Sequence, residues 1–122
     1  MLKLLVIEDE EGARQVVSRL LAVHGYDVVE ASDGEEALAL FRVQADIAMV
    51  LTDLTLPGMS GWEVAAEVKK LSPDTPVIVL SGWDIKNGDE HIRNSGVDRV
   101  LSKPVKIKDI LEALTGLTGG KQ

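Results

Sequence analysis

The sequence contains no cysteine, which excludes disulfide bonds, thiolate metal sites and thiol nucleophiles. Aromatic residues are nearly as scarce: Tyr26, Phe41, Trp62 and Trp83 are the full set, so an aliphatic core is expected. No apolar run approaches the roughly 20 residues that span a bilayer, and Met1-Leu2-Lys3 leads straight into the first strand-like run, so neither a transmembrane helix nor a signal peptide is expected. We therefore expect a cytoplasmic location and no membrane contact.

Basic residues are in the minority, with 13 Lys and Arg against 20 Asp and Glu, for a net charge of −7. Because phosphate contacts need clustered Lys and Arg, nucleic-acid binding by this domain is not expected. The 122 residues suffice for one domain with its own core. We expect that domain to cover residues 1–116, and the polar, glycine-rich stretch 117–122 to be a flexible tail or the start of a linker.

Strand-like and helix-like segments alternate five times along the chain, which is typical of a doubly wound α/β fold with helices on both faces of the sheet. Helical spacing relates Ala13, Val16, Val17, Leu20 and Leu21, followed by Gly25 at the position of a C-terminal cap. Capping-box sequences begin at Ser32 and Ser60, and an apolar stripe runs over 107–114. The fourth helix along the chain, over 86–94, is expected to be marginal, because it has few large apolar residues and contains Asn87-Gly88.

The strand-like runs also predict their order in the sheet. Runs 4–7, 47–51 and 77–80 are apolar at every position, as expected of central parallel strands covered on both faces. Runs 27–31 and 98–101 are short and mixed, as expected of edge strands. The pattern predicts a five-stranded parallel sheet in the flavodoxin-like order 2-1-3-4-5, with its switch point between strands 1 and 3.

Polar side chains follow the apolar runs where the strands end. Glu8 and Asp9 follow the first run, Asp53 the third, Ser81 the fourth, and Lys103 the last. Because the carboxyl ends of parallel strands meet at one edge of the sheet, three carboxylates, a hydroxyl and an ammonium are expected to lie close together. Taken singly, each could be a helix cap or a solvated side chain, but their common position favours a site.

These groups suit a hard divalent cation and a phosphoryl group. Clustered carboxylates would raise one another's pKa values, and a cation relieves this repulsion. Mg²⁺ fits better than Ca²⁺, because it uses one or two protein carboxylates and keeps waters and phosphate oxygens, whereas Zn²⁺ would want Cys or His. An aspartate can also attack a phosphoryl donor to give an aspartyl phosphate, and Asp53 is the best candidate nucleophile.

The motifs Glu8-Asp9, Asp53-Leu54-Thr55-Leu56-Pro57 with Gly61, Ser81-Gly82 and Lys103-Pro104 resemble the pattern of response-regulator receiver domains of two-component signalling. The spacing matches from Leu4 to about Leu114, nearly the whole chain. The resemblance implies a regulatory domain rather than an enzyme, with only self-catalysed phosphotransfer and autodephosphorylation.

The resemblance also implies residue roles. Asp53 would accept the phosphoryl group from a histidine kinase or a histidine phosphotransfer protein. Mg²⁺ would be held by Asp9 directly, by Glu8 through water, by Asp53 and by the backbone carbonyl of Thr55. An unidentified downstream protein would then read the change in contacts, with phosphorylation-dependent dimerisation left open.

Two further site residues follow from the same resemblance. Ser81 would bind the phosphoryl group and draw its loop inward. Lys103 would pair with the phosphoryl oxygens, and the Lys103–Pro104 peptide bond is expected to be cis.

The chain departs from the receiver pattern at two positions. Many receivers have an aromatic residue three positions before the lysine and another after the Lys-Pro pair, where this chain has Val100 and Val105. The usual aromatic rotamer switch is therefore excluded, and we expect a signal to travel through 81–94. We also expect Trp83 to cover the site and to slow hydrolysis of the acyl phosphate.

Three other functions compete with a phosphoacceptor. A phosphatase of the haloacid-dehalogenase type needs a second Asp two residues after the nucleophile, where this chain has Thr55. A flavin-binding module would find its phosphate repelled by Glu8-Asp9-Glu10-Glu11. A phosphate-independent, receiver-like adaptor stays open, as does the choice between a stand-alone protein and a piece of a hybrid kinase or a transcription factor.

Overall fold

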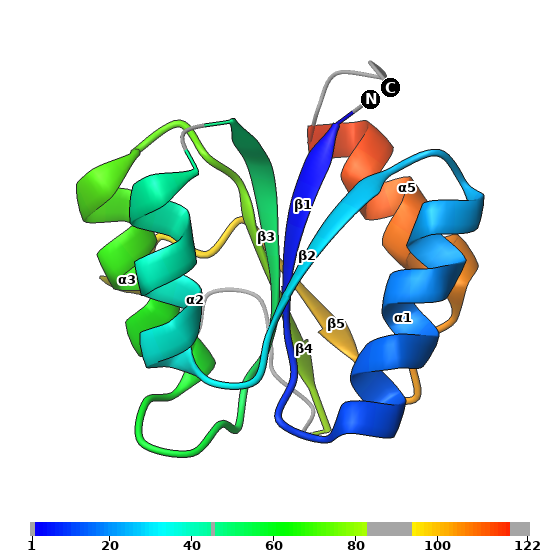
Figure 1. The fold of residues 1–122 in the computed structure, drawn as a ribbon, viewed down its shortest axis with the longest axis horizontal. Helices are drawn as coiled ribbons and strands as arrows, with labels where there is room; N and C mark the ends of the chain where they lie inside the picture. Colours follow the sequence, from blue (N-terminus) through cyan, green and yellow to red (C-terminus); the bar gives the residue numbers. More distant parts are fainter. Residues whose placement is uncertain (1, 45, 83–93, 118–122) are drawn as a thin grey trace.

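The computed structural model describes residues 2–44, 46–82 and 94–117, and these form one parallel sheet flanked by helices (Figure 1). The strand order is β2-β1-β3-β4-β5, as predicted from the apolar runs. The strands are β1 (Lys3–Ile7), β2 (Asp27–Ala31), β3 (Ile47–Asp53), β4 (Val77–Ser81) and β5 (Arg99–Ser102). The helices are α1 (Glu11–Val23), α2 (Gly34–Val43), α3 (Gly61–Leu71) and α5 (Ile107–Leu117).

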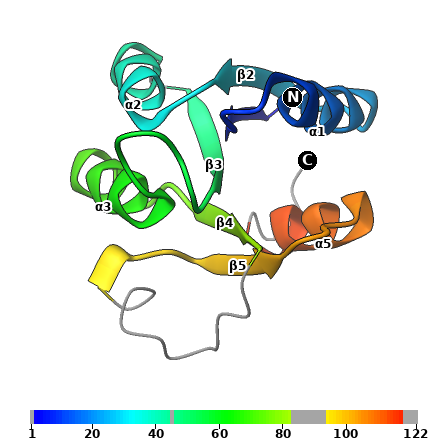
Figure 2. The ribbon, with the colours of Figure 1, turned by 90° about the horizontal axis from the view of Figure 1, so that it is seen from below.

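Helices cover both faces of the sheet: α2 and α3 lie on one side, α1 and α5 on the other (Figure 2). Successive side chains of β1 alternate between the two layers, with Leu5 and Ile7 packed on the α2–α3 side and Leu4 and Val6 on the α1–α5 side. All four are almost fully buried. Coverage of both faces explains why the central strands are apolar at every position.

Two helix ends form as their sequences predict. The α1 helix ends in a Schellman arrangement: Gly25 has φ +93°, its N–H donates to Ala22, and the Tyr26 N–H donates to Leu21. The α3 helix begins with a capping box between Ser60 and Glu63. Both ends therefore lie where the local sequence signals predict them.

One local prediction was wrong, and one predicted helix is only partly buried along its apolar stripe. The cap of α2 is Asp33, not Ser32, because the Asp33 carboxylate accepts the Glu36 N–H at 2.8 Å. On α1, Leu21 is fully buried, but Val16 and Leu20 are 59% and 38% exposed. The helix therefore turns only part of its apolar stripe toward the sheet.

The α3 helix is tied to the far edge of the sheet by a polar contact. The Lys69 ammonium donates to Asp98 Oδ2 at 2.8 Å and to the Thr75 carbonyl at 2.9 Å. The same Asp98 oxygen accepts the Val77 N–H at 2.8 Å. One lysine thus links α3, the start of β4 and the start of β5.

The described residues contain four of the five predicted helices. The helix expected over 86–94 falls almost wholly on 83–93, outside the described residues. The last helix runs to Leu117, one residue into the expected tail, and 118–122 also lie outside. None of the described helices is both long and apolar enough to cross a bilayer.

Candidate functional site

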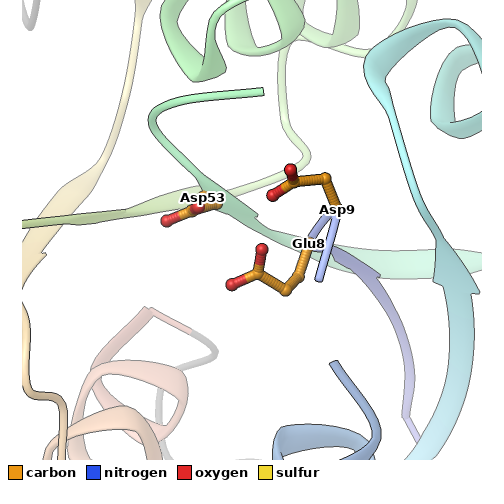
Figure 3. Close-up of side chains that lie close together, drawn as sticks. All are labelled: Glu8, Asp9 and Asp53. Atoms are coloured by element: carbon orange, nitrogen blue, oxygen red, sulfur yellow. The ribbon is translucent and has the colours of Figure 1, made fainter. Parts of the chain in front are cut away.

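The carboxyl ends of β1 and β3 bring three carboxylates together. The two strands are neighbours, with Ile7 paired to Thr52, so the next residues, Glu8 and Asp53, fall side by side. Glu8, Asp9 and Asp53 each offer a carboxylate oxygen, and these oxygens lie within 4.8 Å of one another. Figure 3 shows the three side chains gathered beyond the strand ends. This is the switch point at which open α/β sheets place ligands.

Lys103 supplies the positive charge of the cluster. Its Nζ lies 2.5 Å from Asp53 Oδ1 and 3.7 Å from Glu8 Oε1. The Lys103 N–H donates to the Ser81 carbonyl at 2.7 Å, which fixes this residue beside the end of β4. The Lys103–Pro104 peptide bond is cis, as predicted. The ammonium therefore contacts the residue predicted to accept the phosphoryl group.

The charges perturb one another's ionisation. Burial raises the pKa of Glu8, and its hydrogen bond with Asp9 and the Asp53 charge act in the same direction. Together they outweigh the Glu10 N–H and the Lys103 charge, which lower it. Burial alone would lower the pKa of Lys103, but the contact with Asp53 and the two carboxylate charges raise it above its ordinary value. The folded cluster thus holds more negative charge than its one lysine neutralises.

The donor set suits Mg²⁺. All three side-chain donors are carboxylate oxygens, the hard ligands that Mg²⁺ and Ca²⁺ take in proteins. Oxygens bound to one Mg²⁺ at about 2.0–2.1 Å cannot lie more than about 4.2 Å apart, so the observed cluster needs only a small contraction to share an ion. A second cation would also offset the burial and the Asp53 charge that raise the pKa of Glu8.

The turn after β3 is held tightly beneath Asp53. The Leu54 N–H donates to the Leu80 carbonyl at 2.8 Å, and the Gly61 N–H donates to the Leu54 carbonyl at 2.7 Å. A Cβ on Gly61 would lie 2.6 Å from the Asp53 carbonyl oxygen, so only glycine permits this approach. Thr55 is exposed in this turn, and its carbonyl stays a predicted ligand.

Ser81 ends β4 at the same sheet edge. The residue is fully buried, and β4 pairs with β3 so that Leu80 lies opposite Asp53. Its contact with a phosphoryl group stays a prediction.

The two aliphatic departures from the receiver pattern lie on opposite sides of the sheet. Val100 packs against the α2–α3 layer and Val105 against the α1–α5 layer. Val105 also lines an apolar depression beside Lys103, together with Ala13, Val17, Leu80 and Ile110. Trp83, predicted to cover the site, lies outside the described residues.

Arg14 is a residue that the sequence analysis missed. It donates to the backbone carbonyl of Glu8 at 2.9 Å and to the Glu30 carboxylate at 3.0 Å. A cation close to the N-terminus of a helix opposes the helix dipole. This unfavourable position was the signal in the sequence that could have pointed to a role for Arg14. Its partner Glu30 lies on another strand and could not be read from local sequence.

Comparison with known proteins gives one consistent result. The family described as the response regulator receiver domain matches residues 4–115. A probable transcriptional regulator of Porphyridium aerugineum is 36% identical over 108 residues, which cover 88% of this chain and 44% of that protein. The chain spans about half or less of the length of curated relatives it matches.

Solved structures agree in fold. The Vibrio cholerae chemotaxis protein CheY4 is 29% identical, with a TM-score of 0.89 and coverage of 96% of this chain and 98% of that one. The Thermotoga maritima response regulator TrrA, solved in complex with Mg²⁺-BeF, is 30% identical, with a TM-score of 0.86 and coverage of 96% and 99%.

Proposed function

The chain belongs to the response regulator receiver domain family, and from that premise we propose that it is a Mg²⁺-dependent phosphoacceptor that carries its phosphoryl group on Asp53. Receiver domains are regulatory, which favours this function over the phosphatase and flavin-binding alternatives. The observation that carries the proposal is the cluster itself: Asp53 contacts the Lys103 ammonium within a group of three carboxylates.

The proposed transfer uses few groups. An Asp53 carboxylate oxygen attacks the phosphorus of a phosphohistidine, a P–O bond forms, the P–N bond breaks, and the imidazole leaves and takes up a proton. Lys103 then exchanges its contact with the free carboxylate for one with the phosphoryl oxygens. The Ser81 hydroxyl binds another of these oxygens.

Glu8, Asp9, Asp53 and the Thr55 carbonyl are the proposed Mg²⁺ ligands, with Glu8 acting through water. Bound there, the ion neutralises charge on the phosphoryl group in transfer. Two findings support this: the oxygen-only donor set of the chain, and the Mg²⁺-BeF complex of the similar Thermotoga maritima regulator.

The proposed donor is a histidine kinase or a histidine phosphotransfer protein, and the proposed readout is altered contact with a downstream protein in the cytoplasm. The curated relatives are longer than this chain, and one of them is a probable transcriptional regulator. The output of the whole protein is therefore a separate question from the chemistry at Asp53.

Intact-protein mass after incubation with acetyl phosphate tests the proposal. Wild type should gain the mass of one phosphoryl group with Mg²⁺ and not with EDTA. Asp53→Asn should gain none under either condition.

Each other outcome has a definite meaning. Equal gain by wild type and Asp53→Asn would place the phosphoryl group elsewhere. If wild type gains none, the test is repeated with a phosphorylated histidine phosphotransfer protein as donor, and continued failure would favour a phosphate-independent adaptor.

A further inference from the structure

Arg14 bridges two elements beside the acidic cluster. Its Nη1 donates to the Glu8 carbonyl at 2.9 Å, while its Nε donates to Glu30 Oε1 on β2 at 3.0 Å. The Arg14 side chain is only 15% exposed, so its position is constrained by packing. A planar guanidinium holds its N–H donors in fixed directions toward its two acceptors, whereas the donors of a lysine ammonium rotate and fix no such geometry.

The backbone of Glu8 is thereby held on both sides. Its N–H donates to the Ala31 carbonyl at the end of β2 at 3.1 Å, and its carbonyl accepts from Arg14. The Glu8 carboxylate also accepts the Glu10 N–H at 3.2 Å. Glu8 is thus fixed at its amide, its carbonyl and its side chain.

Both backbone contacts of Glu8 depend on the edge strand β2. Ala31 contributes one directly, and Glu30 orients the arginine that makes the other. The acidic turn is therefore attached to β2 as well as to its own strand, β1.

Building on the phosphoacceptor function proposed above, we infer that Arg14 is a positioning residue that sets the divalent-cation affinity of the site by fixing the Glu8-Asp9 turn against β2. Mg²⁺ demands near-ideal octahedral geometry, so displaced ligands lose affinity steeply. Groups that hold metal ligands in place commonly change metal affinity by about 10- to 100-fold when they are removed.

The test measures Mg²⁺ affinity by titration calorimetry, without any phosphoryl donor, and unfolding free energy in urea with EDTA. Arg14→Met removes both hydrogen bonds and keeps an apolar stem. Arg19→Met is the matched control, because Arg19 is an exposed arginine on the same helix and its loss changes the net charge equally.

Arg14→Met should raise the Mg²⁺ Kd by about tenfold or more. Arg19→Met should change it by less than about twofold, since exposed charges are screened. Arg14→Lys keeps the charge without the two-acceptor geometry and should lose nearly as much affinity as Arg14→Met. Glu30→Gln leaves the arginine in place and should weaken affinity severalfold in the same direction.

A double-mutant cycle separates positioning from general loosening of the fold. In a Glu8→Gln background, Arg14→Met should cost less affinity than in wild type, because the part of its effect that passes through the Glu8 carboxylate is already lost while the part through Asp9 remains.

Failures of the two proposals are distinguishable. Wild type that binds no Mg²⁺ would overturn the proposed function. Wild type that binds Mg²⁺ while Arg14→Met behaves like Arg19→Met, or is fully rescued by Arg14→Lys, would overturn the role of Arg14 alone. The same holds if Arg14→Met lowers the unfolding free energy but leaves the Kd unchanged.

Discussion

Gly61→Ala is expected to damage both stability and the site, because Gly61 packs against backbone rather than against side chains. An added Cβ would lie 2.6 Å from the Asp53 carbonyl oxygen and 3.0 Å from the Leu54 Cα, whereas ordinary contacts begin at 3.4 Å. Neither neighbour can rotate away, so the Asp53–Leu54 peptide must move. The move also disturbs the 2.7 Å hydrogen bond from Gly61 to Leu54.

Two terms set the size of the Gly61→Ala effect. Overpacking costs about 1–3 kcal/mol, and contact with unyielding backbone puts this case near the upper limit. Replacing glycine by alanine also reduces the conformational entropy of the unfolded chain, which stabilises the folded protein by about 0.4–1 kcal/mol. We expect unfolding in urea to show a net loss of about 2 kcal/mol. A displacement of the order of 1 Å at a reacting group can cost about 100-fold in rate, so phosphorylation of the folded variant should also slow markedly.

Gly12→Ala is the matched control. Gly12 also lies in the first turn of a helix, but its added Cβ would meet only the flexible carboxylate end of Glu10, at 3.1 Å. Gly12→Ala should be as stable as wild type or up to about 1 kcal/mol more stable, because it has the same effect on the unfolded chain without meeting rigid backbone. The close-approach argument is refuted if Gly61→Ala and Gly12→Ala lose equal stability. If Gly61→Ala is destabilised yet phosphorylated at the wild-type rate, the link from this contact to Asp53 is refuted.

Three further predictions concern charge. The folded pKa of Glu8 is raised above 4.5, so as pH rises the unfolded chain loses this proton first, and ionisation of Glu8 lowers the free energy of unfolding above pH 4.5. Glu8→Gln should therefore be more stable than wild type in urea at pH 7 with EDTA. Equal or lower stability of the variant would contradict this argument. Lys103→Met removes the partly exposed ion pair with Asp53 and should cost about 1 kcal/mol at pH 7. Because the pKa of Lys103 is raised, that stabilisation is present below 10.5 and disappears as pH rises through the folded value, so the two proteins should converge in strongly alkaline urea titrations. Lys69→Met removes the ammonium that ties α3 to β4 and β5 and should lower the unfolding free energy by about 1.5–3 kcal/mol. Lys70→Met, at a surface ion pair, should lower it by under about 0.5 kcal/mol. Similar losses in the two variants would show that the Lys69 contacts do not stabilise the fold.

The fold was largely readable because its signals are local or follow from coverage of the sheet. Continuous apolar runs mark strands covered on both faces, and shorter mixed runs mark the edges, which together yielded the order β2-β1-β3-β4-β5. The gathering of Glu8, Asp9 and Asp53 followed, since residues just past parallel strands share one edge.

Other features were not readable for physical reasons. Ser32 and Asp33 are both good caps, and the backbone path out of β2 decides for Asp33. The α1 stripe satisfies helical spacing at both Val16 and Leu21, but only the angle at which α1 lies on the sheet decides that Leu21 is buried and Val16 is not.

The sequence by itself determined the secondary-structure elements, the strand order and the chemical groups at the carboxyl-terminal edge of the sheet. Periodicity, caps and strand ends are encoded within a few residues of each other. The tertiary structure decided which groups touch. Lys103 meets Asp53, and Arg14 joins Glu8 to Glu30, only after strands distant in sequence pair in register. Contacts of this kind depend on the precise placement of elements that are far apart in the sequence, and no local pattern specifies that placement.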